Sequence, residues 1–209
     1  MEKLLDEIES YWSTRTEGYS EVNHKELAGT QKNAWLKVLT SQFPDKPKEE
    51  IRILDIGTGP GFFPVILAEA GYHVDAVDYT EGMLEKAKEN AGELCRNIRF
   101  QRMDAQKLEF ADNTFDVVIS RNLTWNLEEP QKAYQEWCRV LKKGGILLNF
   151  DAGWYNYLFD DKQKNAFEED HRNVEDAEVF DFNAYDEAYK MEEIARNLIL
   201  SRCARPTED

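Results

Sequence analysis

The chain has 209 residues, of which 42% are hydrophobic, and 26 Lys+Arg face 41 Asp+Glu, which gives a formal net charge of −15. This length and composition suit one folded domain with a cap and exclude a wholly disordered protein. No apolar run in the sequence approaches the roughly 20 residues of a membrane helix. The excess of negative charge disfavours binding to the phosphates of nucleic acids.

The cysteines and the N-terminal residues indicate the cellular compartment in which the protein is expected. Three widely separated cysteines, Cys95, Cys138 and Cys203, form neither a disulfide framework nor a metal-binding pattern. The opening residues, MEKLLDEIES, are acidic and amphipathic and do not have the basic-then-apolar order of a signal peptide. We therefore expect a cytoplasmic protein without a metal site.

The first 50 residues predict a helical cap or lid. Two helices are expected within residues 1–43, and the second directs Leu27, Ala34, Trp35, Val38 and Leu39 inward. Residues 44–50 are charged and predict a linker to the next part of the chain.

Residues 51–150 alternate between strand and helix patterns, which predicts a parallel sheet with helices on both faces. The predicted strands are residues 51–56, 73–77, 98–103, 115–120 and 146–150. The predicted helices are residues 62–70, residues 80–90 capped by Thr80, and residues 128–141, which Gly144 and Gly145 would end.

Residues 151–209 have a different composition. They carry 7 basic and 16 acidic side chains, net −9, together with many aromatic residues. We expect this part to be mainly helical and to form a second cap over the middle region.

A glycine loop, residues 57–61 (Gly-Thr-Gly-Pro-Gly), follows the first predicted strand of the middle region. Glycines at the carboxyl end of a parallel strand allow a sharp turn and a close approach to a ligand, and the helix behind them offers free N–H groups. Asp78, 21 residues after Gly57, ends the second predicted strand. A carboxylate there can accept hydrogen bonds from both ribose hydroxyls, so the two features predict a nucleoside site.

The spacing of the glycines favours one kind of nucleoside. They fall as G-x-G-x-G with Asp55 two residues before the first, whereas a dinucleotide fingerprint would have its third glycine at Phe62. Further matches in order are Asp78, residues 103–105 (Met-Asp-Ala), residues 115–118 (Phe-Asp-Val-Val) and residues 140–145 (Val-Leu-Lys-Lys-Gly-Gly). Over residues 51–150 the chain resembles the class I S-adenosylmethionine-dependent methyltransferases, especially the small-molecule group that includes ubiquinone and menaquinone methyltransferases.

The resemblance implies a fold and a division of the chain. The fold would be a Rossmann-like, doubly wound, mostly parallel α/β sheet with strand order 3-2-1-4-5. Residues 1–50 would be the N-terminal cap, residues 51–150 the cofactor-binding core, and residues 151–209 the acidic, aromatic cap segment. The cofactor would be S-adenosyl-L-methionine and the product S-adenosyl-L-homocysteine.

The resemblance also implies roles around the ribose and the methionyl group. Asp55 would organise the glycine loop near the methionyl amine, Asp78 would hold the ribose hydroxyls, and Arg121 and Asn122 would line the methionyl end. Within the loop, the residues beneath the cofactor would be Gly57, Thr58, Gly59 and Gly61.

Four other positions would surround the adenine. Tyr79 and Met83 would lie against the ring, Asp104 would accept its amino group, and the Ala105 N–H would meet a ring nitrogen. Met83 equally fits a core position, and Arg121 equally fits an ion pair with Asp116 or another acid.

The N-terminal aromatic residues resemble segments that close over the cofactor. Tyr11 and Trp12, with Arg15 and Tyr19, form this group, and their alternative role is simple helix packing. No catalytic residue is identified; the candidates for a base are Tyr19 and two histidines of the flanking segments, His24 and His171.

The acceptor is expected to be a small molecule. After the fourth predicted strand, residues 120–125 do not contain the Asn/Asp-Pro-Pro-Tyr motif of amino-directed DNA and protein methyltransferases. The rings and negative charge of residues 151–209 favour an amine or other cation. A quinol-like acceptor would use the same rings without the charges, and the acidic faces would then serve only solubility.

Two rival functions stay open: a non-catalytic protein that binds the cofactor, and a nicotinamide-dependent oxidoreductase, which Phe62 contradicts.

The sequence also suggests how the sheet ends after its fifth strand. Class I methyltransferases usually add two strands after the fifth, whereas only residues 197–203 here have a strand-like pattern. We expect the final hairpin to be missing and the fifth strand to be covered by a C-terminal helix or by the second subunit of a homodimer.

Overall fold

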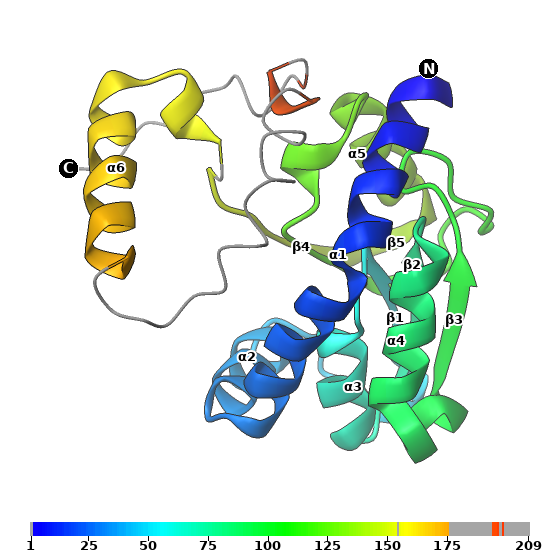
Figure 1. Cartoon of the computed structure of the whole chain (residues 1–209). Coiled ribbons are helices and arrows are strands. Elements are labelled where there is room, and N and C mark those ends of the chain that lie inside the picture. The colour runs from blue at the N-terminus through cyan, green and yellow to red at the C-terminus, as the bar shows by residue number, and fades with distance from the viewer. Residues whose placement is uncertain (1, 154, 176–193, 197, 199–209) are drawn as a thin grey trace.

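A parallel sheet of five strands lies at the centre of the computed structural model, which describes residues 2–153, 155–175, 194–196 and 198 (Figure 1). Its order is β3-β2-β1-β4-β5, and every neighbouring pair is parallel. The strands are β1 (Arg52–Ile56), β2 (His73–Asp78), β3 (Ile98–Arg102), β4 (Phe115–Arg121) and β5 (Leu141–Phe150). The predicted fold class and strand order are confirmed.

The predicted helices are also present in this part of the chain. They are α1 (Glu2–Ala28), α2 (Gln31–Thr40), α3 (Phe62–Glu69), α4 (Glu81–Ala91), α5 (Pro130–Val140) and α6 (Asp161–Glu175). Short 3₁₀ helices are η1 (Lys48–Glu50), η2 (Gly92–Asn97), η3 (Thr124–Asn126) and η4 (Asn156–Leu158). Figure 1 shows α1 crossing in front of the sheet beside α4, with α6 standing away from the strands. Among the described helices, none is long and apolar enough to cross a bilayer.

The two faces of the sheet bury alternate residues, as the period of two in a strand requires. In β1, Leu54 and Ile56 pack in a cluster with Trp137 of α5. Ile53, which directly precedes Leu54, packs on the other face with Phe63 of α3 and other residues of α2 and α3. The core is therefore a three-layer α/β arrangement.

The junction between α5 and β5 differs from the prediction. The helix ends at Val140, before the glycine pair that was expected to end it, and Leu141 already pairs with Phe115 of β4. Gly144 has φ +77°, and the register shifts between Phe115 and Val117. The glycines thus form an irregularity within the strand rather than a helix stop, because a left-handed residue there bends the ladder.

The predicted cap at Thr80 is wrong, whereas the prediction for the C-terminal end of the fold is untested. Thr80 precedes α4, but its side chain makes no capping hydrogen bond. The strand-like pattern of residues 197–203 lies, apart from Leu198, outside the described residues, and so does much of the predicted C-terminal cap. The missing hairpin and the cover of β5 stay predictions.

Candidate cofactor-binding site

A cavity lies at the carboxyl ends of β1, β2, β3 and β4, and α1 forms one of its walls. Its lining consists of Leu5, Ile8, Glu9, Trp12 and Tyr19 of α1, then Gly57, Gly59, residues 78–80, Met83, residues 103–106, residues 121–123, Asn126 and Leu127. Ten of the thirteen residues expected to bind the cofactor line this cavity. The three that do not are Asp55, Thr58 and Gly61.

The glycine loop turns beneath the cavity through left-handed conformations. Gly57 and Gly59 have φ values of +69° and +52°, which side-chain-bearing residues adopt only with strain. A Cβ on Gly57 would lie 2.8 Å from a methyl carbon of Leu123, and a Cβ on Gly59 would lie 3.6 Å from the Tyr19 ring. Glycine is therefore needed at both positions for backbone conformation, and at Gly57 also for space.

Asp78 connects the glycine loop to the beginning of α4. Its Oδ2 accepts a hydrogen bond from the Gly59 N–H at 2.8 Å, and its Oδ1 accepts one from the Thr80 N–H at 2.9 Å. Burial raises the pKa of this carboxyl, whereas the hydrogen bonds from Thr80 and Gly59 lower it. Each oxygen keeps a lone pair with which it could accept a further hydrogen bond.

Asp55 lies behind the loop rather than in the cavity wall. Only 2% of its surface is exposed. Burial raises its pKa to about 7, with Thr58 opposing the shift, Asp78 adding to it and Arg121 opposing it. Gly61 also faces away from the cavity, because a Cβ there would lie 3.0 Å from the Ala87 Cβ of α4.

The wall after β3 is formed by Asp104, Ala105 and Gln106. Asp104 Oδ1 accepts hydrogen bonds from the Gln106 backbone N–H at 2.8 Å and from its side-chain amide at 3.3 Å. Because both bonds go to Oδ1, Oδ2 is the oxygen available to a ligand. Gln106 is a lining residue that sequence reasoning missed, although it directly follows the Asp-Ala pair.

Arg121 is the ion-pair partner of an acid, which was the alternative left open for it. It donates to both carboxylate oxygens of Glu26 on α1, at 3.1 and 2.7 Å, and lies over the Phe62 ring. Asp116 pairs instead with Lys46 and Lys142. Arg121 still lines the cavity beside Asn122, whose N–H donates to the Phe150 carbonyl.

Some aromatic residues of α1 pack against the core, and others line the cavity. Tyr11 is buried at 7% exposure, with the Arg15 guanidinium over its ring. Trp12 and Tyr19 line the cavity and contact each other with ring centroids 5.6 Å apart. Met83, at 3% exposure, is both a core residue and a lining residue.

Other lining residues of α1 gave no signal in the sequence. Leu5 and Ile8 occupy apolar helix positions that look the same whether they cover a core or a pocket. Glu9 accepts a hydrogen bond from Arg102 at 2.7 Å, and Arg102 Nε donates to the Tyr79 carbonyl at 2.8 Å. Arg102 thus links α1 to the end of β2. Glu9, Tyr79 and Arg102 are far apart in the sequence and meet only in the folded chain.

The structure places one of the two histidine candidates relative to the cavity. His24 is exposed on α1 and does not line it. His171 belongs to α6, and its side chain lies outside what the structure describes. Of the two candidates whose side chains the structure describes, Tyr19 lines the cavity and His24 does not.

Comparison with known proteins gives one family. Residues 54–149 match the family model of a methyltransferase domain. A demethylmenaquinone methyltransferase of Renibacterium salmoninarum is 32% identical over 148 residues, which are 71% of this chain and 60% of that protein. One of Clavibacter sepedonicus is 42% identical over 98 residues, which are 46% of this chain and 39% of that protein.

A solved structure from Methanococcus maripaludis supports the fold alone. It has a TM-score of 0.61 at 21% identity and covers 87% of this chain and 84% of its own. The chain spans less than two thirds of the length of the two curated relatives. The family match, the strand order and the glycine loop agree, and the α/β core of this chain belongs to the class I S-adenosylmethionine-dependent methyltransferases.

Proposed function

We propose that this protein transfers the methyl group of S-adenosyl-L-methionine to a small-molecule acceptor by in-line displacement. The cavity carries the proposal, because it joins the glycine loop, Asp78 and Asp104 at the carboxyl ends of adjacent strands. The residues fit the cofactor: Gly57 and Gly59 expose backbone to the cavity, and Asp104 Oδ2 is available to an amino group.

The cofactor supplies an electrophilic methyl group on a sulfonium. In this proposal the chain contributes orientation and exclusion of water. Asp78 holds the ribose hydroxyls, Asp104 and Ala105 contact the adenine edge, and Trp12 and Tyr19 of α1 shield the cavity from solvent.

Binding tests the first half of the proposal. S-adenosylhomocysteine is expected to raise the melting temperature, because a ligand of the native state stabilises it by mass action, and NADH is expected to have no effect. Asp78→Ala should weaken binding by about 1–3 kcal/mol, since it removes an acceptor and frees two backbone donors. Asp75→Asn, on the same strand but outside the cavity, is the control. A shift with NADH alone would overturn the assignment.

Turnover tests the second half and separates it from non-catalytic binding. The assay measures S-adenosylhomocysteine formed in the presence of amines, phenols, thiols and a demethylmenaquinone analogue. Stabilisation by the cofactor without product from any acceptor would support a binding protein instead.

For the acceptor we propose a small cation or amine. Support comes from the rings of Trp12 and Tyr19 in the lining and from the net −9 of residues 151–209. The names of the relatives support the rival, a neutral demethylmenaquinone-like ring. The Michaelis constant of a cationic acceptor should rise with ionic strength, whereas a neutral acceptor with a salt-insensitive constant would refute the cationic class.

The remaining parts of the proposal concern location and assembly. A reducing cytoplasm is supported by Cys95 and Cys138, which are free thiols. A homodimer covering β5 is tested by light scattering of the purified protein.

A further inference from the structure

The loop between β3 and β4, residues 103–114, has little regular structure of its own. It contains one isolated bridge, between Asp104 and Lys107, yet its first four residues all line the cavity. A segment of this kind must take its conformation from the elements against which it packs. For this loop that element is α5.

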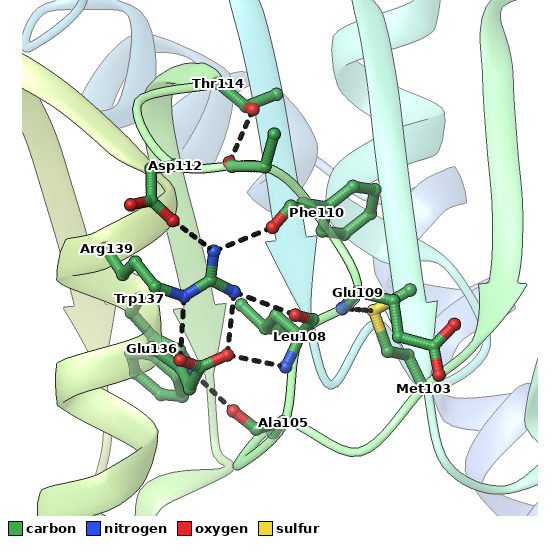
Figure 2. Close-up of polar contacts among 11 residues, drawn as sticks. Met103, Ala105, Leu108, Glu109, Phe110, Asp112, Thr114, Glu136, Trp137 and Arg139 are labelled. Atoms are coloured by element: carbon green, nitrogen blue, oxygen red, sulfur yellow. Dashed lines mark hydrogen bonds and ion pairs between the residues drawn. The ribbon is translucent and has the colours of Figure 1, made fainter.

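Arg139 of α5 holds the loop by its backbone (Figure 2). Its Nη2 donates to the Leu108 carbonyl at 2.8 Å, and its Nη1 donates to the Phe110 carbonyl and to Asp112 Oδ1, both at 2.7 Å. Nε and Nη2 also donate to the two oxygens of Glu136, each at 2.8 Å. The guanidinium therefore uses all three of its nitrogens.

Glu136 contacts both Arg139 and the loop. Its Oε2 accepts the Leu108 N–H at 3.0 Å, so both backbone groups of Leu108 are held by α5 side chains. The neighbouring Arg139 lowers the pKa of Glu136, which keeps the carboxylate charged. The pair acts as one clamp on the middle of the loop, drawn in Figure 2.

Two further contacts link α5 to the lining residues themselves. The buried Trp137 donates its indole N–H to the Ala105 carbonyl at 2.9 Å. At the start of the helix, the Glu129 N–H donates to the Gln106 side-chain carbonyl at 2.6 Å, and the amide of the same side chain donates to Asp104 Oδ1. The position of Asp104 is thus fixed by a chain of contacts that ends on α5.

We propose that Arg139 is a positioning residue for purine recognition: by holding the loop after β3 it places Asp104 to accept a 6-amino group and to reject a 6-oxo group. The inference rests on the proposed function, since it requires an adenosyl ligand in the cavity. Arg139 does not line the cavity, so its effect must pass through the loop. Lysine could not replace it, because an ammonium has three donors at one point and lacks the planar fork.

The experiment compares two ligands by calorimetry: S-adenosylhomocysteine and S-inosylhomocysteine, in which a carbonyl replaces the 6-amino group. The wild-type protein should bind the adenosyl compound more tightly. Arg139→Lys should weaken that binding about tenfold and leave the inosyl compound nearly unchanged, so the ratio of the two dissociation constants moves toward one. Lys142→Met, which removes an ion pair to Asp116 away from the cavity, should leave the ratio unchanged.

A double-variant cycle shows whether Arg139 acts through Asp104. Asp104→Ala should lower the discrimination, and Arg139→Lys should change the ratio less in this variant than it does in the wild-type protein. Asp112→Ala, at an exposed end of the clamp, should shift the ratio in the same direction by less and serves if Arg139→Lys does not fold.

The outcomes separate the inference from the proposed function. An unchanged ratio in a destabilised Arg139→Lys or Asp112→Ala protein would make the clamp purely structural and overturn the inference alone. A wild-type protein that binds neither ligand would overturn the proposed function and the inference with it. Binding with discrimination but without methyl transfer would refute catalysis and leave the inference standing.

Discussion

Two buried carboxyl groups of the sheet have opposite pKa shifts. Burial raises the pKa of Asp55 to about 7, because Thr58 and Arg121 offset only part of the burial penalty. Asp116 is also penalised by burial, but hydrogen bonds from Lys142, Lys46 and the Arg52 N–H outweigh that penalty and lower its pKa to about 2. The difference lies in the partners, since both side chains are nearly inaccessible.

Asp55 should make the protein less stable as the pH rises. A carboxyl with a raised pKa binds its proton more tightly in the folded state, so stability falls between about pH 4 and pH 7 and is level above that. The cost at pH 8 is on the order of 4 kcal/mol. Asp55→Asn should flatten this part of the curve and raise the free energy of unfolding at pH 8, as measured by urea titration. A wild-type curve that rises from pH 4 to 7 and an unchanged slope in the variant would contradict it.

Asp116 should have the opposite effect at acid pH. Its lowered pKa contributes stability that is present above about pH 4 and is lost as the pH falls toward 2. Asp116→Asn should lower the free energy of unfolding at pH 7 by about 2 kcal/mol and reduce the acid dependence between pH 4 and pH 2. Equal acid sensitivity in the two proteins would show that Asp116 does not contribute.

Gly57 and Gly71 allow a matched comparison of glycine substitutions. Both have a positive φ, but a Cβ on Gly57 would meet Leu123 at 2.8 Å, whereas nothing lies within 4 Å of a Cβ on Gly71. Gly71→Ala should cost about 1 kcal/mol of stability by strain and leave S-adenosylhomocysteine binding intact. Gly57→Ala should destabilise more and raise the dissociation constant, since Leu123 must move into the cavity. Equal binding by both variants would show that the clash is relieved elsewhere.

Among single residues, the sequence identified those whose type and local spacing indicate their role. The glycine loop and the acids at strand ends are such residues, because loop and strand end meet wherever parallel strands are adjacent. Glu26, Arg102 and Arg139 could not be identified in this way. Each acts on a partner far away in the chain, and an isolated Arg or Glu has no pattern that indicates that partner.

At the scale of elements, α1 has two kinds of neighbour. Its first part lines the cavity and its last part pairs with Arg121 through Glu26, while Glu17 pairs with Lys86 of α4. Helix α1 thus contacts both the cavity and the core, and the division of the chain into a cap of residues 1–50 and a core stays a prediction.

Trp12 tests whether α1 is part of the binding site. Trp12→Ala removes a lining ring and should weaken S-adenosylhomocysteine binding by about 1–2 kcal/mol. Val22→Ala on the same helix is the control, because that side chain is 51% exposed and does not line the cavity. Calorimetry measures both. Similar affinities in the two variants would restrict α1 to a packing role.

The strands of the middle region were predictable because their apolar runs are short and bounded by glycine or acidic residues. The early end of α5 was not. Residues 128–141 have a helical period throughout, and only the pairing of Leu141 with Phe115 moves that residue into β5. Tertiary pairing overrides local preference at such a junction.

For the whole molecule, the strand order followed from the family resemblance and from chain connectivity, since right-handed crossovers leave few arrangements. The cavity wall contributed by α1 could not be predicted in this way, because no connection rule fixes where a helix that precedes the first strand packs. The acceptor class is also a property of the whole chain, because the proposal for it depends on the net charge of residues 151–209 as well as on the cavity lining.

The length of α1 has a mechanical consequence. It is one uninterrupted helix, and its Glu26 end is fastened to the sheet through a bidentate ion pair over aromatic rings. Leu5 lies about 30 Å from that anchor at the usual rise per residue. A rigid tilt of about 5° around the Glu26 end would therefore displace Leu5 by about 3 Å while every helical hydrogen bond stays intact. Glu9 pairs with Arg102 near that far tip, so a tilt of the helix would widen the opening there only after this ion pair breaks.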